Sequence, residues 1–272
     1  MGTAPDDALV ERLRAAGCVF AEEEAAALRE AAGTPAELDA MARRRTSGEP
    51  LEQVVGWTAF CGLRIGVEPG VFVPRRRSAL LVHEAVRLLA AYGTGPHEVP
   101  VVVDLCCGSG ALGAAIADGA ATSGLGRVEL YAADVDPVAV GCARRNMAAA
   151  GGHVVCGDLD EPLPAALRGA VRVLVANVPY VPTAAIAGMP PEARDHEPRR
   201  ALDGGADGLD VLRRVAAAAP RWLAPGGSLL VETSDRQQAA AVAAVEAEGL
   251  TARVVTSVDL DATIVVGRWA GA

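Results

Sequence analysis

The stretch VVVDLCCGSGALGAAIA, residues 101–117, decides how the centre of this 272-residue chain folds. It opens with an apolar run without polar–apolar alternation, typical of a strand buried on both faces, which we predict over residues 99–105. Its alanine-rich second half predicts a helix over residues 109–120. Between them, Gly108 and Gly110 allow a tight turn that leaves N–H groups at the helix start free to meet a polar or anionic ligand. The stretch therefore predicts a ligand site.

Strand and helix patterns alternate from this stretch to the end of the chain. Further strands are predicted at residues 128–134, 153–156, 171–177, 228–233, 252–257 and 263–269, and further helices at 137–150, 208–223 and 236–248. Repeated strand–helix–strand order predicts an α/β fold with a mostly parallel sheet and helices on both faces. In such sheets, ligands bind beyond the carboxyl ends of the strands.

An acid stands at the end of each of the next two strands. Asp134 ends the strand in AADVDP, and Asp158 follows the third strand in GDLDEPLP. A carboxylate at a strand tip can accept hydrogen bonds from the hydroxyls of a ribose. The glycine turn and the two acids stand at three successive strand ends. Their common position favours a binding site for a nucleoside cofactor over the simpler interpretation that each is only a polar loop residue. Because Gly113 completes a formal G-x-G-x-x-G spacing, NAD and other adenosine ligands remain alternatives at this point.

The first 47 residues read as short helices. We predict them at residues 6–16, 21–32 and 34–45. The third helix begins with Thr34-Pro-Ala-Glu37, a capping box that places proline at the first helical position. This pattern predicts a small N-terminal helical domain over residues 1–47.

The pattern changes between residues 48 and 77. Short β-rich runs separated by glycines and prolines favour a hairpin of two strands, which we treat as a linker over residues 48–77. A helix is predicted at 78–92 and a loop at 93–100. We therefore expect the ligand-binding domain to cover residues 78–272.

Composition excludes several classes of function. The formal charge is −9 and no basic face is visible in the sequence, so we expect no direct nucleic-acid binding. The cysteines show neither C-x-x-C nor metal-type spacing with histidine, which predicts reduced thiols, no metal site and a cytoplasmic protein. No stretch has the pattern of a signal peptide or the length of a membrane span, so no membrane association is expected. The oligomeric state is not readable from the sequence.

The strand predicted at residues 171–177 ends in ANVPYVPT, residues 176–183. An amide, Asn177, stands beside the constrained pair Val178-Pro179 and the aromatic Tyr180. An asparagine after a strand is often only a turn former. Beside the predicted nucleoside site, its amide becomes a candidate for binding a substrate.

Taken together, these motifs resemble a known family. Asp104-x-Cys-x-Gly-Ser-Gly110, Asp134, Asp158 and Asn177-x-Pro-Tyr180 are similar to the motifs of class I S-adenosylmethionine methyltransferases. More closely, they resemble the release-factor glutamine N5-methyltransferases. Residues 48–75 resemble the linker hairpin of that family, and residues 190–215 resemble its distinctive segment after the catalytic loop. The second segment is far more specific than a glycine turn and argues against an NAD enzyme.

The resemblance implies a fold and a reaction. The fold would be a Rossmann-like domain with a seven-stranded, mostly parallel sheet, preceded by a helical domain that helps to recognise the substrate. S-adenosylmethionine would give its methyl group to the side-chain amide nitrogen of a glutamine in a protein, such as a peptide chain release factor, leaving S-adenosylhomocysteine. The implied cofactor-binding residues are Asp104, Cys106, Gly108, Gly110, Asp134, Val135, Asp158, Leu159 and Asn177. Asn177, Val178, Pro179 and Tyr180 would form the catalytic loop and, with Arg75, bind the substrate.

The sequence departs from the family pattern at three places. Val178 replaces the first proline of Asn-Pro-Pro-Tyr, Arg76-Arg77-Ser78 replaces Pro-Glu-Thr, and Cys106 replaces a glycine. We expect Val178 to keep its backbone carbonyl in place and to change the pocket, and Cys106 to add bulk beside the cofactor. These departures keep three alternatives open: an amino-methyltransferase acting on nucleic acid, one acting on a small molecule or peptide, and a binding module without activity.

Overall fold

A seven-stranded sheet forms the centre of the protein, whose computed structural model describes residues 5–92 and 99–271. The strands lie in the order β5-β4-β3-β6-β7-β9-β8. Their bounds are β3 Val101–Leu105, β4 Glu129–Asp134, β5 His153–Cys156, β6 Val171–Ala176, β7 Leu223–Thr233, β8 Thr251–Ser257 and β9 Ala262–Arg268. Strands β3 to β7 run parallel, whereas β9 is antiparallel to both β7 and β8. The predicted α/β fold with a mostly parallel sheet is confirmed.

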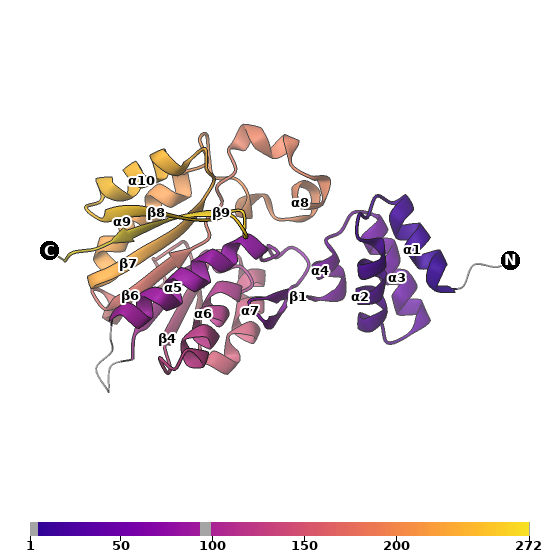
Figure 1. The fold of residues 1–272 in the computed structure, drawn as a ribbon, viewed down its shortest axis with the longest axis horizontal. Helices are drawn as coiled ribbons and strands as arrows, with labels where there is room; N and C mark the ends of the chain where they lie inside the picture. Colours follow the sequence, from indigo (N-terminus) through magenta and orange to yellow (C-terminus); the bar gives the residue numbers. More distant parts are fainter. Residues whose placement is uncertain (1–4, 93–98, 272) are drawn as a thin grey trace.

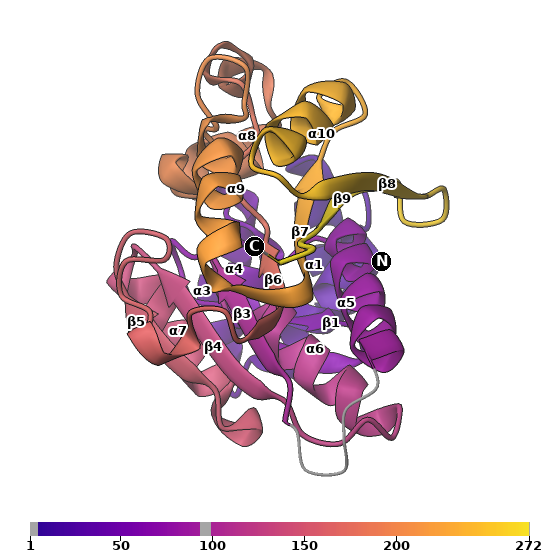
Figure 2. The same ribbon diagram turned by 90° about the vertical axis from the view of Figure 1, so that its left-hand side faces the viewer.

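Helices cover both faces of this sheet (Figures 1 and 2). Helices α5 (Ala79–Tyr92), α6 (Ala111–Thr122) and α7 (Pro137–Asn146) pack on one face, and α9 (Asp210–Trp222) and α10 (Gln238–Ala247) pack on the other. Both cores consist mainly of Ala, Val and Leu, and all five residues of β3 are buried. Because β5, β4, β3 and β6 are parallel neighbours, their carboxyl ends meet at one edge of the sheet.

The N-terminal helices form a separate bundle at one end of the molecule (Figure 1). Helices α1 (Pro5–Ala15), α2 (Ala21–Ala31) and α3 (Pro35–Thr46) share a small core around Leu13, Ala25 and Leu28 with α4 (Leu51–Val55). The predicted capping box is present: the hydroxyl of Thr34 accepts from the N–H of Glu37 at 3.2 Å, and the Glu37 carboxylate accepts from the N–H of Thr34 at 3.1 Å.

The predicted hairpin consists of β1 (Trp57–Phe60) and β2 (Leu63–Gly66). Its two-residue turn, Cys61-Gly62, has φ of 49° and 81°, as a type I′ turn requires. Helix α4 precedes the hairpin where we predicted no helix. It lies between Pro50 and the left-handed Gly56, and the side chain of Gln53 holds it by donating to the carbonyl of Val71 at 2.9 Å.

Other differences are local. Strand β7 begins at Leu223, five residues before the prediction, because Leu223 already pairs with Val171 of β6 and the Pro-Gly-Gly run forms an irregularity within the strand. Helix α7 ends at Asn146 and is followed by a 3-10 turn at Ala148–Ala150. Helix α8 (Pro191–His196) was not predicted. Most of the predicted loop, residues 93–98, lies outside the described residues. None of the helices in the described ranges is long and apolar enough to cross a membrane.

Asn146, at the end of α7, connects the hairpin to the glycine turn. Its side-chain oxygen accepts from the N–H of Gly66 at 2.9 Å, and its side-chain nitrogen donates to the carbonyls of Gly66 and Ser109, both at 2.8 Å. The hairpin and the turn after β3 are therefore hydrogen-bonded to the same side chain.

Replacing Asn146 with alanine leaves one N–H and two carbonyl groups without this partner. We expect Asn146→Ala to lower the free energy of unfolding by about 2 kcal/mol, as measured by urea denaturation. Arg145→Ala is the matched control, because the neighbouring Arg145 forms an exposed ion pair with Glu68 and should change stability by less than about 0.5 kcal/mol. Equal effects of the two substitutions would contradict this account of Asn146.

Candidate functional site

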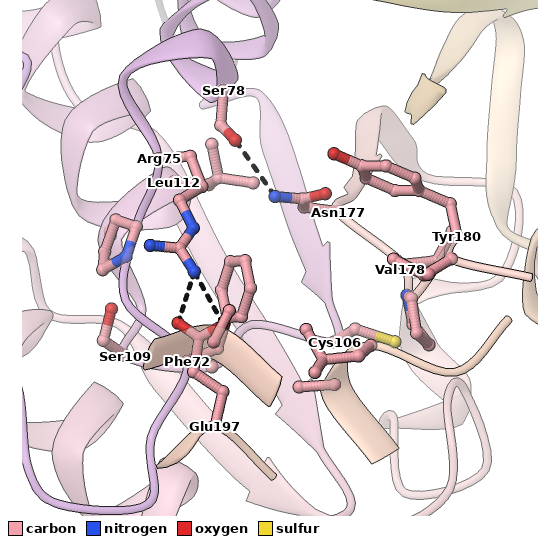
Figure 3. A pocket seen from close by; sticks show the side chains of 18 of the residues that line it. Phe72, Arg75, Ser78, Cys106, Ser109, Leu112, Asn177, Val178, Tyr180 and Glu197 are labelled. Carbon is pink, nitrogen blue, oxygen red and sulfur yellow. Dashed lines mark hydrogen bonds and ion pairs between the residues drawn. The ribbon is translucent and has the colours of Figure 1, made fainter. Parts of the chain in front are cut away.

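Two adjoining cavities lie at the carboxyl ends of β3, β4, β5 and β6. The larger has a volume of about 440 Å³ and the smaller about 170 Å³. Six residues line both cavities: Phe72, Cys106, Gly108, Asp134, Pro179 and Ala201. Figure 3 shows the larger cavity, with side chains from the linker, the glycine turn and the loop after β6 around it. The continuous space and its shared wall suit one extended ligand that has a second molecule beside it.

The glycine turn faces this space in part. Cys106, Gly108 and Gly110 all have positive φ, at 55°, 53° and 77°. A Cβ atom on Gly108 would meet no heavy atom within 4 Å, so this glycine leaves open space for a ligand. A Cβ on Gly110 would instead lie 2.9 Å from the sulfur of Met147 and 3.0 Å from Cα of Ala143. Gly110 therefore lets the turn pack on α7 and does not line either cavity, contrary to our expectation.

Asp104 also lies behind the cavity wall and not in it. Its side chain is fully buried, and one oxygen accepts from the N–H of Gly113 at 3.0 Å. The other oxygen has no hydrogen-bond partner among the described residues. Burial raises the pKa of Asp104 to about 7, despite the opposing hydrogen bond from Gly113. This carboxyl supports the turn from below and cannot touch a ligand in the cavities.

Asp134 lies where the two cavities meet. One carboxylate oxygen accepts from the N–H of Gly108 and the other from the N–H of Asp136, both at 2.9 Å. Burial raises its pKa, although these two hydrogen bonds oppose the rise. Each oxygen keeps lone-pair capacity for a further donor, so the pair can accept from two neighbouring hydroxyls.

The predicted residues Val135, Asp158 and Leu159 all line the smaller cavity. Asp158 forms an ion pair with Arg214 at 2.7 Å and is 46% exposed. Leu159 has a φ of 47° and a buried side chain, so the chain after β5 bends sharply around the cavity. The structure thus gathers these three at the end of the site farther from Asn177.

The loop after β6 presents the amide of Asn177 to the larger cavity (Figure 3). Its side-chain nitrogen donates to the hydroxyl of Ser78 at 3.0 Å, and that hydroxyl donates to Glu232 at 2.6 Å. Because the single proton of Ser78 goes to the carboxylate, its oxygen can only accept from Asn177. This fixes the orientation of the Asn177 amide and leaves its carbonyl oxygen available to a ligand.

Glu232, near the end of β7, is the main residue that our sequence reasoning missed. Its carboxylate is 1% exposed and accepts from Ser78 and from the hydroxyl of Tyr180, the latter at 3.0 Å. Nε of Arg77 lies 3.7 Å away. Burial is the main cause that raises the pKa of Tyr180, and the negative charge of Glu232 raises it further. The available signal was a lone acid, in SLLVET, at the end of an apolar strand.

Val178 lines the larger cavity and also packs into the protein interior (Figure 3). Its side chain is 2% exposed and belongs to the apolar core between the sheet and α9. That the valine changes the pocket therefore stays a prediction. Its position before Pro179 still favours the extended backbone that the loop needs.

The segment at residues 190–215 holds the loop from outside. The N–H of Val181 donates to the carbonyl of Leu202, and the N–H of Gly204 donates to the carbonyl of Val181, both at 2.9 Å. A Cβ on Gly204 would lie 2.6 Å from the carbonyl oxygen of Pro179, and one on Gly208 would lie 2.3 Å from that of Tyr180. Only glycine allows this close approach of the two backbones.

The same segment also binds the linker. The side chain of Glu197 is fully buried and forms an ion pair with Arg75. Both of its carboxylate oxygens lie 2.6 Å from the same guanidinium nitrogen of Arg75. It also accepts from the N–H of Val73 at 3.2 Å. The guanidinium of Arg75 lies 5.0 Å from the ring centre of Phe72. Arg75 therefore lines the larger cavity with its charge already paired.

Comparison with known proteins shows which family the chain belongs to. The chain is 39% identical over 205 residues to a release factor glutamine methyltransferase of Geobacter sulfurreducens, covering 73% of this chain and 66% of that protein. It is 38% identical over 212 residues to the one of Mycolicibacterium smegmatis, covering 78% and 71%. The chain belongs to the release factor glutamine methyltransferase family. It spans about two thirds of the length of these relatives.

Three further comparisons broaden this picture. The family model for the methyltransferase small domain matches residues 64–187. The chain is also 36% identical over 207 residues to a 4-amino-L-phenylalanine/4-methylamino-L-phenylalanine methyltransferase of Streptomyces pristinaespiralis, covering 76% of this chain and 68% of that protein. Among solved structures, a methyltransferase from Pyrococcus furiosus matches with a TM-score of 0.51 and 16% identity, over 78% of this chain and 90% of that one. This last likeness supports the fold.

Family membership makes the protein an S-adenosylmethionine-dependent methyltransferase, and the two cavities fit that cofactor. The open space above Gly108 accommodates a ligand that passes close to the backbone. The paired oxygens of Asp134 match the two ribose hydroxyls, and the smaller cavity is lined largely by apolar groups, as a purine ring requires. Within residues 5–92 and 99–271, no group of three or more His, Cys, Asp or Glu side chains could hold a metal ion.

The buried Asp104 predicts a pH dependence of stability. Its pKa of about 7 in the folded protein exceeds its ordinary value of 3.8, so the folded state holds a proton that the unfolded chain releases. This contribution is complete below about pH 4 and is lost as the pH rises to about 7. As the pH rises across this interval, we expect the wild type to lose up to about 4 kcal/mol of unfolding free energy relative to Asp104→Asn, whose amide does not titrate. Urea denaturation at a series of pH values, without cofactor, measures it, and a constant difference would contradict the buried, protonated Asp104.

Proposed function

We propose that the protein transfers a methyl group from S-adenosylmethionine to the side-chain amide nitrogen, N5, of a glutamine in a protein. A peptide chain release factor is the first candidate for that protein. The observation that carries this proposal is the fixed amide of Asn177, whose carbonyl oxygen faces the larger cavity beside the cofactor space. Two curated relatives named for the same reaction support it.

A carboxamide nitrogen is a weak nucleophile because its lone pair is delocalised into the carbonyl group. The protein must therefore hold this nitrogen in line with the methyl group, and positioning is its main contribution. In our proposal, the carbonyl oxygen of Asn177 and the backbone carbonyl of Val178 accept the two N–H groups of the glutamine. They turn the lone pair towards the methyl group and stabilise the positive charge that develops on nitrogen. The proton leaves after transfer, so a strong general base is not required.

Tyr180 and Pro179 complete the acceptor site in this proposal. The ring of Tyr180 packs against the flat amide of the acceptor, since its hydroxyl is held by the buried Glu232 at 3.0 Å. Glu232 also holds Ser78, which orients Asn177. One carboxylate thus positions both the amide and the aromatic side of the site.

The cofactor, when bound, supplies a methyl group on a positively charged sulfur. We assign Asp134 to the ribose and the wall of the smaller cavity, formed by Val135, Asp158 and Leu159, to the adenine. Cys106 and Gly108 would lie beside the methionine part. We further propose that the helices of residues 1–47 and the linker of 48–77 form the face to which the acceptor protein binds, and that residues 78–272 carry the reaction in the cytoplasm.

A second candidate is methylation of the amino group of a small molecule. The observation that favours it is the relative named for 4-amino-L-phenylalanine, at 36% identity. An aromatic amine also offers two N–H groups to the carbonyls of Asn177 and Val178. Incubating the protein with S-adenosylmethionine and with either a glutamine protein or an aromatic amine separates the two, because mass spectrometry then detects a gain of about 14 Da, the mass of one CH2 group, on only one of them.

Asn177 tests the mechanism directly. We expect Asn177→Ala to lower the transfer rate by at least about 100-fold, because one of the two acceptors for the amide N–H groups is lost. Cofactor affinity, measured by calorimetry, should change by less than about threefold. A variant with full activity would show that Asn177 does not bind the acceptor.

Glu232 tests the positioning network. A glutamine side chain offers one carbonyl in place of two carboxylate oxygens, so Glu232→Gln leaves either Ser78 or Tyr180 without its acceptor. We expect transfer to fall by about 10- to 100-fold, on the basis of about 1.5 to 3 kcal/mol for a charged hydrogen bond, with cofactor affinity retained. Glu246→Gln, on the exposed face of α10, is the matched control and should transfer at the wild-type rate. Equal rates for both variants would remove Glu232 from the mechanism.

A further inference from the structure

We propose that Arg77 binds a carboxylate group on the methyl acceptor, so that the protein selects acceptors bearing a negative charge close to the methylated nitrogen. This inference rests on the proposed function, because it concerns the same larger cavity. The proposed function does not specify the charge of the acceptor, because neither the loop after β6 nor the cofactor site determines it. A carboxylate site at Arg77 would specify it.

Most charged side chains that line the larger cavity are already paired. Arg75 is held by Glu197 at 2.6 Å, and Glu192 faces Arg45 at 3.3 Å. Asp134 accepts from two backbone N–H groups and faces the ribose position. None of these groups supplies an unpaired cation at the acceptor end of the cavity.

Arg77 differs from them. Its side chain is 46% exposed, and it makes no hydrogen bond to any residue in the described ranges. Its one ion-pair contact joins Nε to Glu232 at 3.7 Å, beyond hydrogen-bond distance. The carboxylate of Glu232 is already engaged by Ser78 and Tyr180. The two terminal nitrogens of Arg77 therefore keep their N–H groups for a ligand.

The position of Arg77 determines how far the bound carboxylate can lie from the methylated nitrogen of the acceptor. It directly precedes Ser78, whose hydroxyl binds Asn177, and it reaches the same carboxylate as Tyr180. An acceptor amide held by Asn177 thus has the guanidinium within the reach of a neighbouring residue or of its own backbone. The planar fork of N–H groups matches the two oxygens of a carboxylate.

A simpler role for Arg77 is to balance the buried charge of Glu232. That role predicts the same effect of an Arg77 substitution on every acceptor, because it acts through Ser78 and Tyr180. A carboxylate site predicts an effect that depends on the charge of the acceptor. The experiment must therefore compare paired acceptors and not only variants.

The carboxylate has two sources, an acidic side chain next to the glutamine or the α-carboxylate of a free amino acid. The first arm uses blocked peptides in which the residue before or after the glutamine is either Asp or its neutral isostere Asn, so that each peptide holds a single glutamine. The second arm compares free L-glutamine with L-glutaminamide. Binding to the full-length protein saturated with S-adenosylhomocysteine is measured by calorimetry, and methyl transfer is measured separately.

We expect the wild type to bind the carboxylate member of at least one pair about three- to fivefold more tightly, as one half-exposed ion pair allows. Arg77→Gln should abolish this preference, and Arg77→Glu should shift it to peptides with a neighbouring lysine. Arg76→Gln is the matched control, because the exposed Arg76 does not line the cavity, and it should keep the preference.

Three results would overturn the proposal: equal binding within both pairs, a preference that survives Arg77→Gln, or the same loss of affinity for charged and neutral acceptors in that variant. Failure of the proposed function looks different. In that case no glutamine acceptor is methylated by the wild type, whereas the binding measurements still report whether Arg77 recognises a carboxylate.

Discussion

The buried carboxylate of Glu232 is the constraint around which the active site is organised. A carboxylate that is 1% exposed is stable only when donors or cations compensate for the water it has lost. Its hydrogen-bond donors come from separate parts of the chain: Ser78 directly follows the linker, and Tyr180 lies in the loop after β6. The charge at the end of β7 therefore holds the end of the linker and the loop after β6 together, beside the larger cavity.

Close backbone contacts provide the second constraint. The loop after β6 is held by a segment whose glycines approach its carbonyl groups so closely that a single methyl group would not fit. The turn after β3 rests on α7 in the same way at Gly110. Such contacts leave the loops little freedom, which suits a reaction that depends on alignment more than on acid–base chemistry.

The alternating strand and helix patterns were sufficient to predict the fold, because each strand is a short apolar run and each connection carries a clear turn or capping signal. The strand-end residues Asp134 and Asn177 were found for the same reason, since the carboxyl ends of parallel strands meet at one edge. That Gly110 lines neither cavity was not predicted, because spacing does not show whether a residue faces a cavity or the helix behind it. Glu232 was missed, since a contact across 154 residues of sequence with Ser78 leaves no local pattern.

Asn146 has a thermodynamic consequence. Its amide joins the hairpin, which leads to the N-terminal helices, to the backbone of Ser109 in the turn beside the cofactor. If the cofactor orders that turn, and if the hairpin belongs to the acceptor-binding face as we propose, this shared side chain couples the two binding events. Linkage then requires each ligand to change the affinity for the other by the same factor. The coupling can therefore be measured from either side, as a change in cofactor affinity or as a change in acceptor affinity.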